Sequence, residues 1–283
     1  MLVLLFRLLS FLPLRVLHAL GAALGWLVYG VSPSYRRRLR GNLERAGYGH
    51  LLHQAIAEAG KAIVELPFLW CARPERVAAS AVEDNYALVE QALAGGHGIV
   101  FLTPHLGCFE ITAQQVALRT KLTVMYRPPK QAALKPLMEG ARARGNLHLA
   151  PATLAGVRIL ARNLKNGEPV GVLPDQVPQQ GEGVWAPFFG RPAYSMTLPA
   201  KLARMGKSPV LLVYAERLPK GKGFRLRFSR FTGSLDGDAA AQAASINHAM
   251  EQLIAECPAQ YYWSYNRYKQ PDGVAGPAAT ESA

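Results

Sequence analysis

The stretch GIVFLTPHLGCFE, residues 98–110, decides the fold of this chain. Its first part, residues 99–102, is a short apolar run after two glycines, as expected of a strand that is buried on both faces. The polar residues that follow predict a loop around His105 and then the start of a helix. A buried strand followed by a helix is the repeating unit of a parallel α/β sheet.

The rest of the chain continues this alternation. Further apolar runs predict strands at residues 122–126, 169–173, 209–216 and 224–231. Helical spacing of apolar residues is found at 51–68, 132–144, 154–165, 195–205 and 238–256. Strands that alternate with helices imply an α/β fold with a mostly parallel central sheet flanked by helices on both faces.

Length and composition limit the fold further. The chain has 283 residues, of which 50% are hydrophobic and 18% charged, so it is neither a disordered tail nor a coiled coil. We divide it into an N-terminal segment, 1–45, a main domain, 46–270, and a tail, 271–283, that we expect to be disordered. Three scattered cysteines suit neither a disulfide framework nor a zinc site, so we expect a reducing compartment and no metal or cofactor.

The N-terminal segment is strongly apolar. Residues 16–35 carry no full charge, and a helix of this length would measure about 30 Å, the thickness of a bilayer core. Four arginines follow within residues 36–40 and would keep the rest of the chain on the cytoplasmic side. We therefore predict a helix that crosses the membrane or lies on it. A cleaved signal peptide and an ordinary buried helix are the alternatives.

The net charge of +13 indicates an anionic partner: nucleic acid, an acidic membrane surface, or an acidic substrate or carrier. The excess is localised, with +6 in residues 1–45, +5 in residues 121–144 and +8 in residues 201–230. This distribution differs from a uniformly basic nucleic-acid coat, and the chain has no nucleic-acid motif. We therefore expect no nucleic acid, and the charge leaves an acidic membrane surface and an acidic substrate or carrier as the candidate partners.

His105 and Glu110 are the candidate catalytic pair. A neutral histidine is a general base near pH 7, and a carboxylate on its far nitrogen would fix the tautomer. An offset of five residues puts two side chains on different faces of a helix, so contact requires His105 to lie in the loop before it. Such a pair can deprotonate a substrate hydroxyl. Cys108 lies between them and is an alternative nucleophile, as in a thioesterase or hydrolase.

Other polar and aromatic candidates follow the next two predicted strands. Active-site groups in open α/β sheets gather at the carboxyl ends of the strands. The candidates for binding substrate are Tyr126, Arg127, Arg142, Arg144, Asp175 and Gln176. Only one of the two arginines at 142 and 144 can face the site, because they are two residues apart on a predicted helix. The candidates for lining an acyl-chain groove, which could equally be core, are Trp185, Phe188 and Phe189.

Taken together, these segments resemble one family, the late lauroyl/myristoyl acyltransferases of lipid A biosynthesis, which are lysophospholipid-acyltransferase-like enzymes. The resemblance covers residues 1–271 and rests on the ordered set HLGCFE (105–110), YRPPK (126–130), GARARG (140–145), LKNGEPVGVLPDQ (164–176), VWAPFFGRPA (184–193) and QYYWSYNRYKQP (260–271). It implies a glycerolipid acyltransferase-like fold and transfer of a fatty acyl chain from acyl carrier protein to a hydroxyl of an anionic lipid A precursor. The implied location is the cytoplasmic face of the inner membrane.

The resemblance also implies roles for individual residues. His105 would be the general base and Glu110 would orient it, while Arg142 and Asp175 match family positions. The implied mechanism is direct transfer without an acyl-enzyme. Many members have Asn and Trp where this chain has Cys108 and Phe109, so the acceptor could also be another phospholipid, aminolipid or glycolipid.

Overall fold

The structure, a computed structural model, describes residues 2–127 and 131–277. Its larger helices are α1 (Leu2–Leu9), α2 (Leu14–Val31), α3 (Pro33–Arg45), α4 (Leu52–Val64), α5 (Leu66–Cys71), α6 (Pro74–Ala78), α7 (Ala87–Ala94), α8 (Phe109–Val116), α9 (Lys135–Arg142), α10 (Leu154–Lys165), α11 (Leu198–Gly206) and α12 (Ala239–Glu256). The strands are β1 (Ala81–Asp84), β2 (Val100–Leu102), β3 (Leu122–Tyr126), β4 (Leu147–Pro151), β5 (Val170–Val172), β6 (Gly183–Phe188), β7 (Arg191–Met196), β8 (Val210–Arg217) and β9 (Phe224–Arg230).

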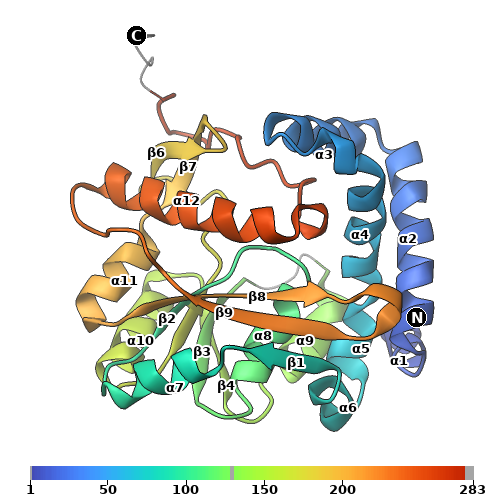
Figure 1. Cartoon of the computed structure of the whole chain (residues 1–283), viewed down its shortest axis with the longest axis horizontal. Coiled ribbons are helices and arrows are strands. Elements are labelled where there is room, and N and C mark those ends of the chain that lie inside the picture. Colours follow the sequence, from blue (N-terminus) through green and yellow to red (C-terminus); the bar gives the residue numbers. More distant parts are fainter. Residues whose placement is uncertain (1, 128–130, 278–283) are drawn as a thin grey trace.

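Seven of the strands form one sheet in the order β1-β9-β8-β2-β5-β3-β4. Every neighbouring pair is parallel except β8 and β9, which are joined as an antiparallel hairpin. Strands β6 and β7 form a separate hairpin that lies beside α12 (Figure 1). The structure therefore confirms the predicted α/β fold with a mostly parallel sheet.

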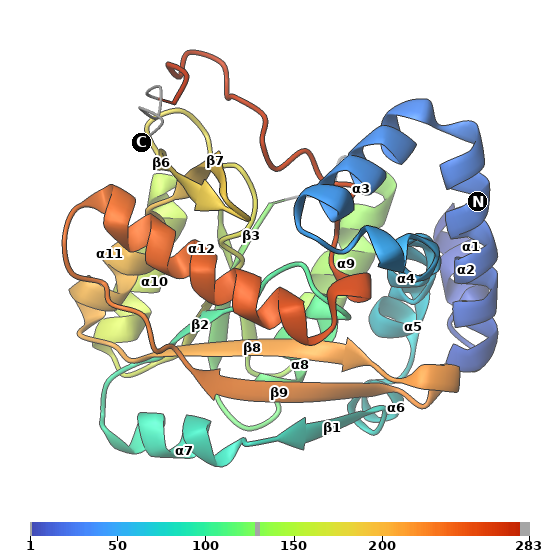
Figure 2. The same cartoon turned by 45° about the horizontal axis from the view of Figure 1, so that its top comes forward.

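Helices cover both faces of the sheet, as predicted. One core cluster packs α7, α8 and α9 against the sheet, and a second packs α10, α11 and α12 against the other face. Figure 2 shows α12 above β8 and β9, whereas α7 and β1 lie below these two strands. The central strands β2 and β5 are buried at every residue, which is why their sequences are uninterrupted apolar runs.

The structure also contains strands that the sequence pattern does not reveal. Strand β1 has the sequence AVED and lies at the edge of the sheet, so half of it is polar. Strand β4 is the other edge and includes a histidine and a proline. The predicted helix at 195–205 begins only at Leu198, because the residues before it belong to β7. Of the predicted disordered tail, residues 278–283 lie outside the described residues.

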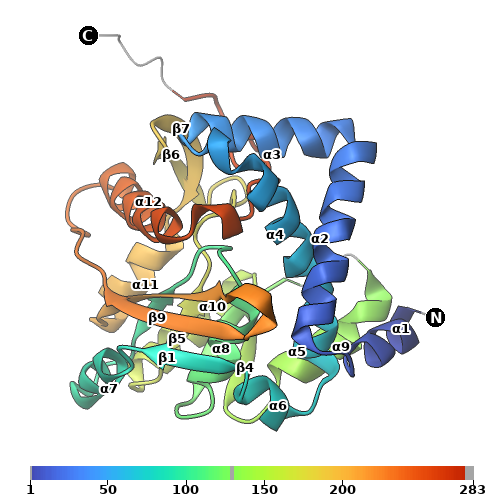
Figure 3. The same ribbon diagram turned by 45° about the vertical axis from the view of Figure 1, so that its right-hand side comes forward.

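The N-terminal helices pack along the side of this domain (Figure 3). Helix α2 runs beside α4 in backbone contact, through glycines at positions 21, 25 and 60. A side chain at Gly60 would place its Cβ 1.9 Å from the carbonyl oxygen of Gly21, so only glycine permits this approach. Helix α1 packs on α5, where Phe6 stacks on Trp70 with 5.8 Å between the ring centroids.

Candidate active site

A cavity of about 340 Å³ opens at the carboxyl ends of β2, β3 and β5. This size lies within the range of ligand sites, roughly 300–1,000 Å³. Its polar part includes His105, Glu110, Arg127, Arg142 and Gln176. Its apolar part lies between α8 and the sheet and is lined by Phe101, Ala113, Val116, Leu122, Val124 and Val213. The cavity therefore combines a polar mouth with an apolar interior.

His105 and Asp175 meet because their strands are in register. Leu102, the last residue of β2, pairs with Val172, the last residue of β5, and each functional residue follows its strand by three positions. The Oδ2 atom of Asp175 accepts the backbone N–H of His105 at 2.8 Å, and its Oδ1 atom lies 2.8 Å from Nδ1 of the ring. The carboxylate thus fixes both the backbone and the ring of His105.

The charge of Asp175 sets the tautomer of His105. Burial alone would raise the pKa of this carboxyl, but the charge and hydrogen bonds of His105 outweigh burial and lower its pKa below the usual value. An ionised carboxylate only accepts hydrogen bonds, so Nδ1 of His105 carries the proton and Nε2 holds the free lone pair. Nε2 receives the side-chain amide of Gln176 at 3.1 Å. The basic nitrogen therefore faces the cavity.

Backbone contacts hold the loop that carries His105. Gly107 has a φ of +57°, and a side chain there would collide with the carbonyl oxygen of Ala215. The same carbonyl accepts the N–H of Cys108 at 2.8 Å, and the N–H of Tyr262 donates to the carbonyl oxygen of His105 at 3.0 Å. The C-terminal aromatic segment, residues 260–271, is thus a support of the site, a role for which its sequence gave no local signal.

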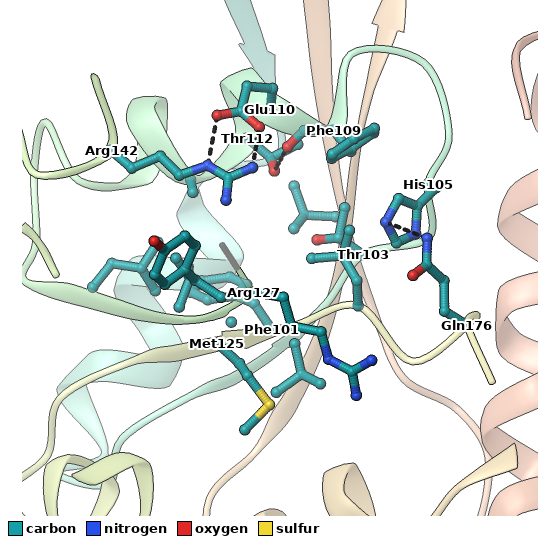
Figure 4. Close-up of a pocket in the computed structure, with 18 of the residues that line it drawn as sticks. Phe101, Thr103, His105, Phe109, Glu110, Thr112, Met125, Arg127, Arg142 and Gln176 are labelled. Atoms are coloured by element: carbon teal, nitrogen blue, oxygen red, sulfur yellow. Dashed lines mark hydrogen bonds and ion pairs between the residues drawn. The ribbon is translucent and has the colours of Figure 1, made fainter. Parts of the chain in front are cut away.

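Glu110 forms a different pair. Its carboxylate accepts two hydrogen bonds from Arg142, at 2.7 and 2.5 Å, and a third from the indole N–H of Trp70 at 2.9 Å. Burial would raise the pKa of Glu110, but the charge and hydrogen bonds of Arg142, with the Trp70 hydrogen bond, lower it, so the group is a buried carboxylate. In Figure 4, Glu110 is turned to Arg142, whereas His105 is turned to Gln176.

In place of the expected contact between Glu110 and His105, the structure shows a contact between Asp175 and His105. His105 lies in the loop before α8, as its spacing required, but Asp175 takes the place on Nδ1 that Glu110 was expected to fill. The physical reason is that Arg142 already occupies both oxygens of Glu110. Trp70 is the member of this cluster that the sequence did not indicate.

The remaining polar candidates divide into two groups. Tyr126, Arg127 and Gln176 line the cavity. The hydroxyl of Tyr126 donates to Glu139 on α9, while Arg127 is exposed at the mouth. Arg144 points elsewhere and donates to the carbonyl oxygens of Trp70 and Ala72 at the end of α5. Only Arg142 of the arginine pair lines the cavity, as the spacing predicted.

The three aromatic candidates for an acyl groove do not line this cavity in the part of the chain that the structure describes. Phe188 is buried beneath α12, and Phe189 packs on Trp263 at 5.6 Å between ring centroids. Trp185 lies on β6 and donates to the carbonyl oxygen of Ala275. Phe188 and Phe189 therefore belong to the second core cluster, whereas Trp185 is half-buried outside it.

Cys108 has the environment of a structural thiol. It is 2% exposed, and burial together with the negative charge of Glu65 raises the pKa of its thiol well above the usual value. It therefore stays protonated near neutral pH, and it is not among the described residues that line the cavity. This environment argues against the alternative of a cysteine thioesterase.

We expect Cys108→Ala to retain transferase activity within about threefold, since the change removes one buried sulfur. Intact-mass spectrometry after incubation with acyl donor should show the wild type and the variant each at its own unmodified mass, without an acyl adduct. A stable adduct on the wild type that Cys108→Ala lacks would restore the cysteine mechanism.

Comparisons with known proteins identify the family. The family described as bacterial lipid A biosynthesis acyltransferase matches residues 1–270. Among curated relatives, the lipid A biosynthesis lauroyltransferase of Escherichia coli K12 is 26% identical over 93% of this chain and 89% of its own length. The lipid A biosynthesis palmitoleoyltransferase of the same organism is 26% identical over 91% of this chain and 86% of its own. The chain belongs to the bacterial lipid A biosynthesis acyltransferase family.

Proposed function

We propose that this acyltransferase moves a fatty acyl chain from acyl carrier protein to a hydroxyl of a lipid A precursor resembling Kdo2-lipid IVA, with His105 as the general base. The observation that carries the proposal is the juxtaposition of Nε2 of His105 with an apolar interior in one cavity. A base at the mouth of an apolar cavity suits a reaction between a polar hydroxyl and a lipid tail.

The reaction follows from the positions of these groups. The acyl chain of the thioester lies in the apolar interior between α8 and the sheet, so its carbonyl carbon reaches the polar mouth. The oxygen of the acceptor hydroxyl attacks that carbonyl, and Nε2 of His105 takes the proton of the hydroxyl at the same time. Asp175 stabilises the imidazolium that forms. When the tetrahedral intermediate collapses, the C–S bond breaks and the thiolate of the carrier receives the proton from Nε2.

Gln176 and Arg127 line the cavity and are candidates for binding the reactants. The amide of Gln176 occupies the position beside Nε2 that the acceptor hydroxyl must take, so it moves aside when the acceptor binds. Arg127 is a cation at the mouth and suits a phosphate of the acceptor. Glu110 acts in this scheme through Arg142, which it holds against the cavity wall by two hydrogen bonds.

The experiment that tests this function incubates purified enzyme with lauroyl-acyl carrier protein and Kdo2-lipid IVA. We expect the lipid to gain the mass of one lauroyl group and the carrier to return to its free thiol form, both observed by mass spectrometry. Boiled enzyme is the control for uncatalysed transfer. Release of free laurate without a lipid product would show a hydrolase instead, and an unreacted donor with every lipid acceptor tried would refute the proposal.

A further inference from the structure

The most exposed apolar surface of the molecule belongs to its first two helices. Of the seventeen large apolar side chains that are exposed in the described residues, ten lie within residues 2–31. We call these ten the N-terminal apolar surface: Leu4, Leu5, Leu8, Phe11, Val16, Leu20, Leu24, Trp26, Leu27 and Val31. A surface of this kind on a soluble domain marks a contact with a partner or a membrane.

We propose that α1 and α2 lie in the plane of an anionic membrane interface, on one side of the bilayer, and that α2 does not cross it. Length and composition alone would permit α2 to cross, because it is an apolar helix of 18 residues. The proposal goes beyond the proposed reaction, and its readouts do not depend on acyl transfer. It is carried by what α2 packs against.

Helix α2 is fixed to α4 over most of its length. Near its start, Nε2 of His18 lies 3.1 Å from Glu65, one residue beyond the end of α4. In its middle, a Cβ on Gly25 would come 2.2 Å from the carbonyl oxygen of Ile56, so the two backbones touch. Further along, the ring of Trp26 lies 5.5 Å from that of His53. The depth of α2 in a bilayer is therefore also the depth of α4.

Helix α4 and its partners are too polar for the centre of a bilayer. Glu58 of α4 pairs with Lys61 at 2.5 Å and with Arg217 at 2.7 Å, and Arg217 also forms two hydrogen bonds with Glu65. Arg217 belongs to β8 of the central sheet and donates to the carbonyl oxygen of Gly107 in the active-site loop. A crossing α2 would carry this charge network and part of the sheet into hydrocarbon.

The outward side of α2 has the pattern of an interfacial helix. Val16, Leu20, Leu24, Leu27 and Val31 recur at intervals of three or four residues and form one exposed apolar stripe, opposite the face that packs on α4. Figure 3 shows α1 and α2 together along the same edge of the molecule. The helix is thus apolar on its outer side and bound to a polar domain on its inner side, as expected of a helix lying in an interface.

The charges around this surface are basic. Residues 2–43 contain six arginines and no acidic residue. The turn between β8 and β9 adds exposed Lys220 and Lys222 beside the start of α2, where Gly221 approaches the backbone of Arg15. Lysine and arginine at the rim of an apolar surface attract anionic lipid headgroups. An extended apolar surface with a basic rim fits an anionic membrane, so we assign Lys220 and Lys222 to lipid headgroups.

The decisive experiment compares the two ends of α2. One protein carries a Gly-Ser-Cys-Ser extension before Met1, and the other carries Ser34→Cys; both have Cys71→Ala and Cys257→Ala, and Cys108 is buried. A membrane-impermeant maleimide is added to intact bacterial spheroplasts and, separately, to lysed ones. We expect both cysteines to react only after lysis. Reaction of the extension in intact spheroplasts, while Ser34→Cys stays protected, would show that α2 crosses the membrane and would overturn the proposal.

A second experiment tests the occupant of the surface. Full-length protein is sedimented with vesicles of phosphatidylethanolamine and phosphatidylglycerol. We expect Leu20→Glu/Leu24→Glu/Leu27→Glu to reduce the bound fraction about tenfold or more, because three exposed apolar side chains that would enter the bilayer become charged. The control is Leu118→Glu/Leu154→Glu, which changes two leucines that are at least as exposed on average but lie outside the surface, and it should bind like the wild type. Equal binding by the triple variant, or equal loss in the control, would contradict a membrane at this surface.

Discussion

The Asp175→Asn variant should lose about 10³–10⁴ in kcat while its fold and its acceptor affinity stay close to those of the wild type. In the native enzyme, Asp175 accepts from both the backbone N–H and Nδ1 of His105. An asparagine can turn its NH₂ group toward Nδ1, which would then act as an acceptor and leave the proton on Nε2. That tautomer has no lone pair in the cavity for the acceptor hydroxyl. Steady-state rates with acyl carrier protein donor measure the loss.

The matched comparison is Glu110→Gln, which changes the other buried carboxylate of the cavity. Glutamine keeps one hydrogen-bonding oxygen for Arg142 and does not touch His105, so we expect its effect on kcat to be at least tenfold smaller than that of Asp175→Asn. His105→Ala sets the baseline for an enzyme without the base. If Glu110→Gln proved as damaging as His105→Ala while Asp175→Asn stayed active, Glu110 would be the partner of the base after all.

The Arg217→Met variant should lose about 3–5 kcal/mol of unfolding free energy, because it leaves a buried carboxylate without its counter-ion. Both Arg217 and Glu65 have side chains only 2% exposed, and two hydrogen bonds at 2.6 and 2.7 Å join them. Urea unfolding of the detergent-solubilised protein, followed by circular dichroism, measures the change. Activity should fall as well, since Arg217 also holds the carbonyl oxygen of Gly107 beside His105.

Two further variants separate the cost of the unpaired charge from the loss of packing. Arg217→Met/Glu65→Leu should regain much of the lost stability, because no isolated carboxylate remains. Arg40→Met breaks an exposed pair with Glu44 and should cost less than about 1 kcal/mol. A double variant no more stable than Arg217→Met would mean that packing, and not the charge of Glu65, determines the loss.

The sequence predicted the sheet well, because its central strands are uninterrupted apolar runs that end in polar residues. It also indicated both His105 and Asp175, each following a proline at the exit of a strand. The sequence did not predict the contact between His105 and Asp175. Strand β5 lies between β2 and β3 in the sheet, although β5 comes after both of them in the chain. Strand order depends on contacts between distant segments, whereas Glu110 is close to His105 in sequence and was the natural candidate.

The sequence did not indicate the apolar wall of the cavity, for a related reason. Its apolar wall consists of side chains such as Phe101, Val124 and Val213, whose sequence pattern is that of ordinary core. Composition does not distinguish a wall that faces a cavity from one that faces another side chain. Of the conspicuous aromatic residues, Phe188 is buried in the second core cluster, and Trp185 lies half-buried on β6.

The close pairing of α2 with α4 decides how a detergent-free form of the enzyme can be prepared. Deleting residues 1–31 would uncover the face of α4 that contains Gly60 and would remove His18 from Glu65, which in turn holds Arg217 beside the active-site loop. The shortened protein would gain solubility at one surface and expose a new apolar one. Polar replacement of the outward leucines on an intact α2 avoids this loss, so surface redesign is the route to a soluble enzyme and truncation is not.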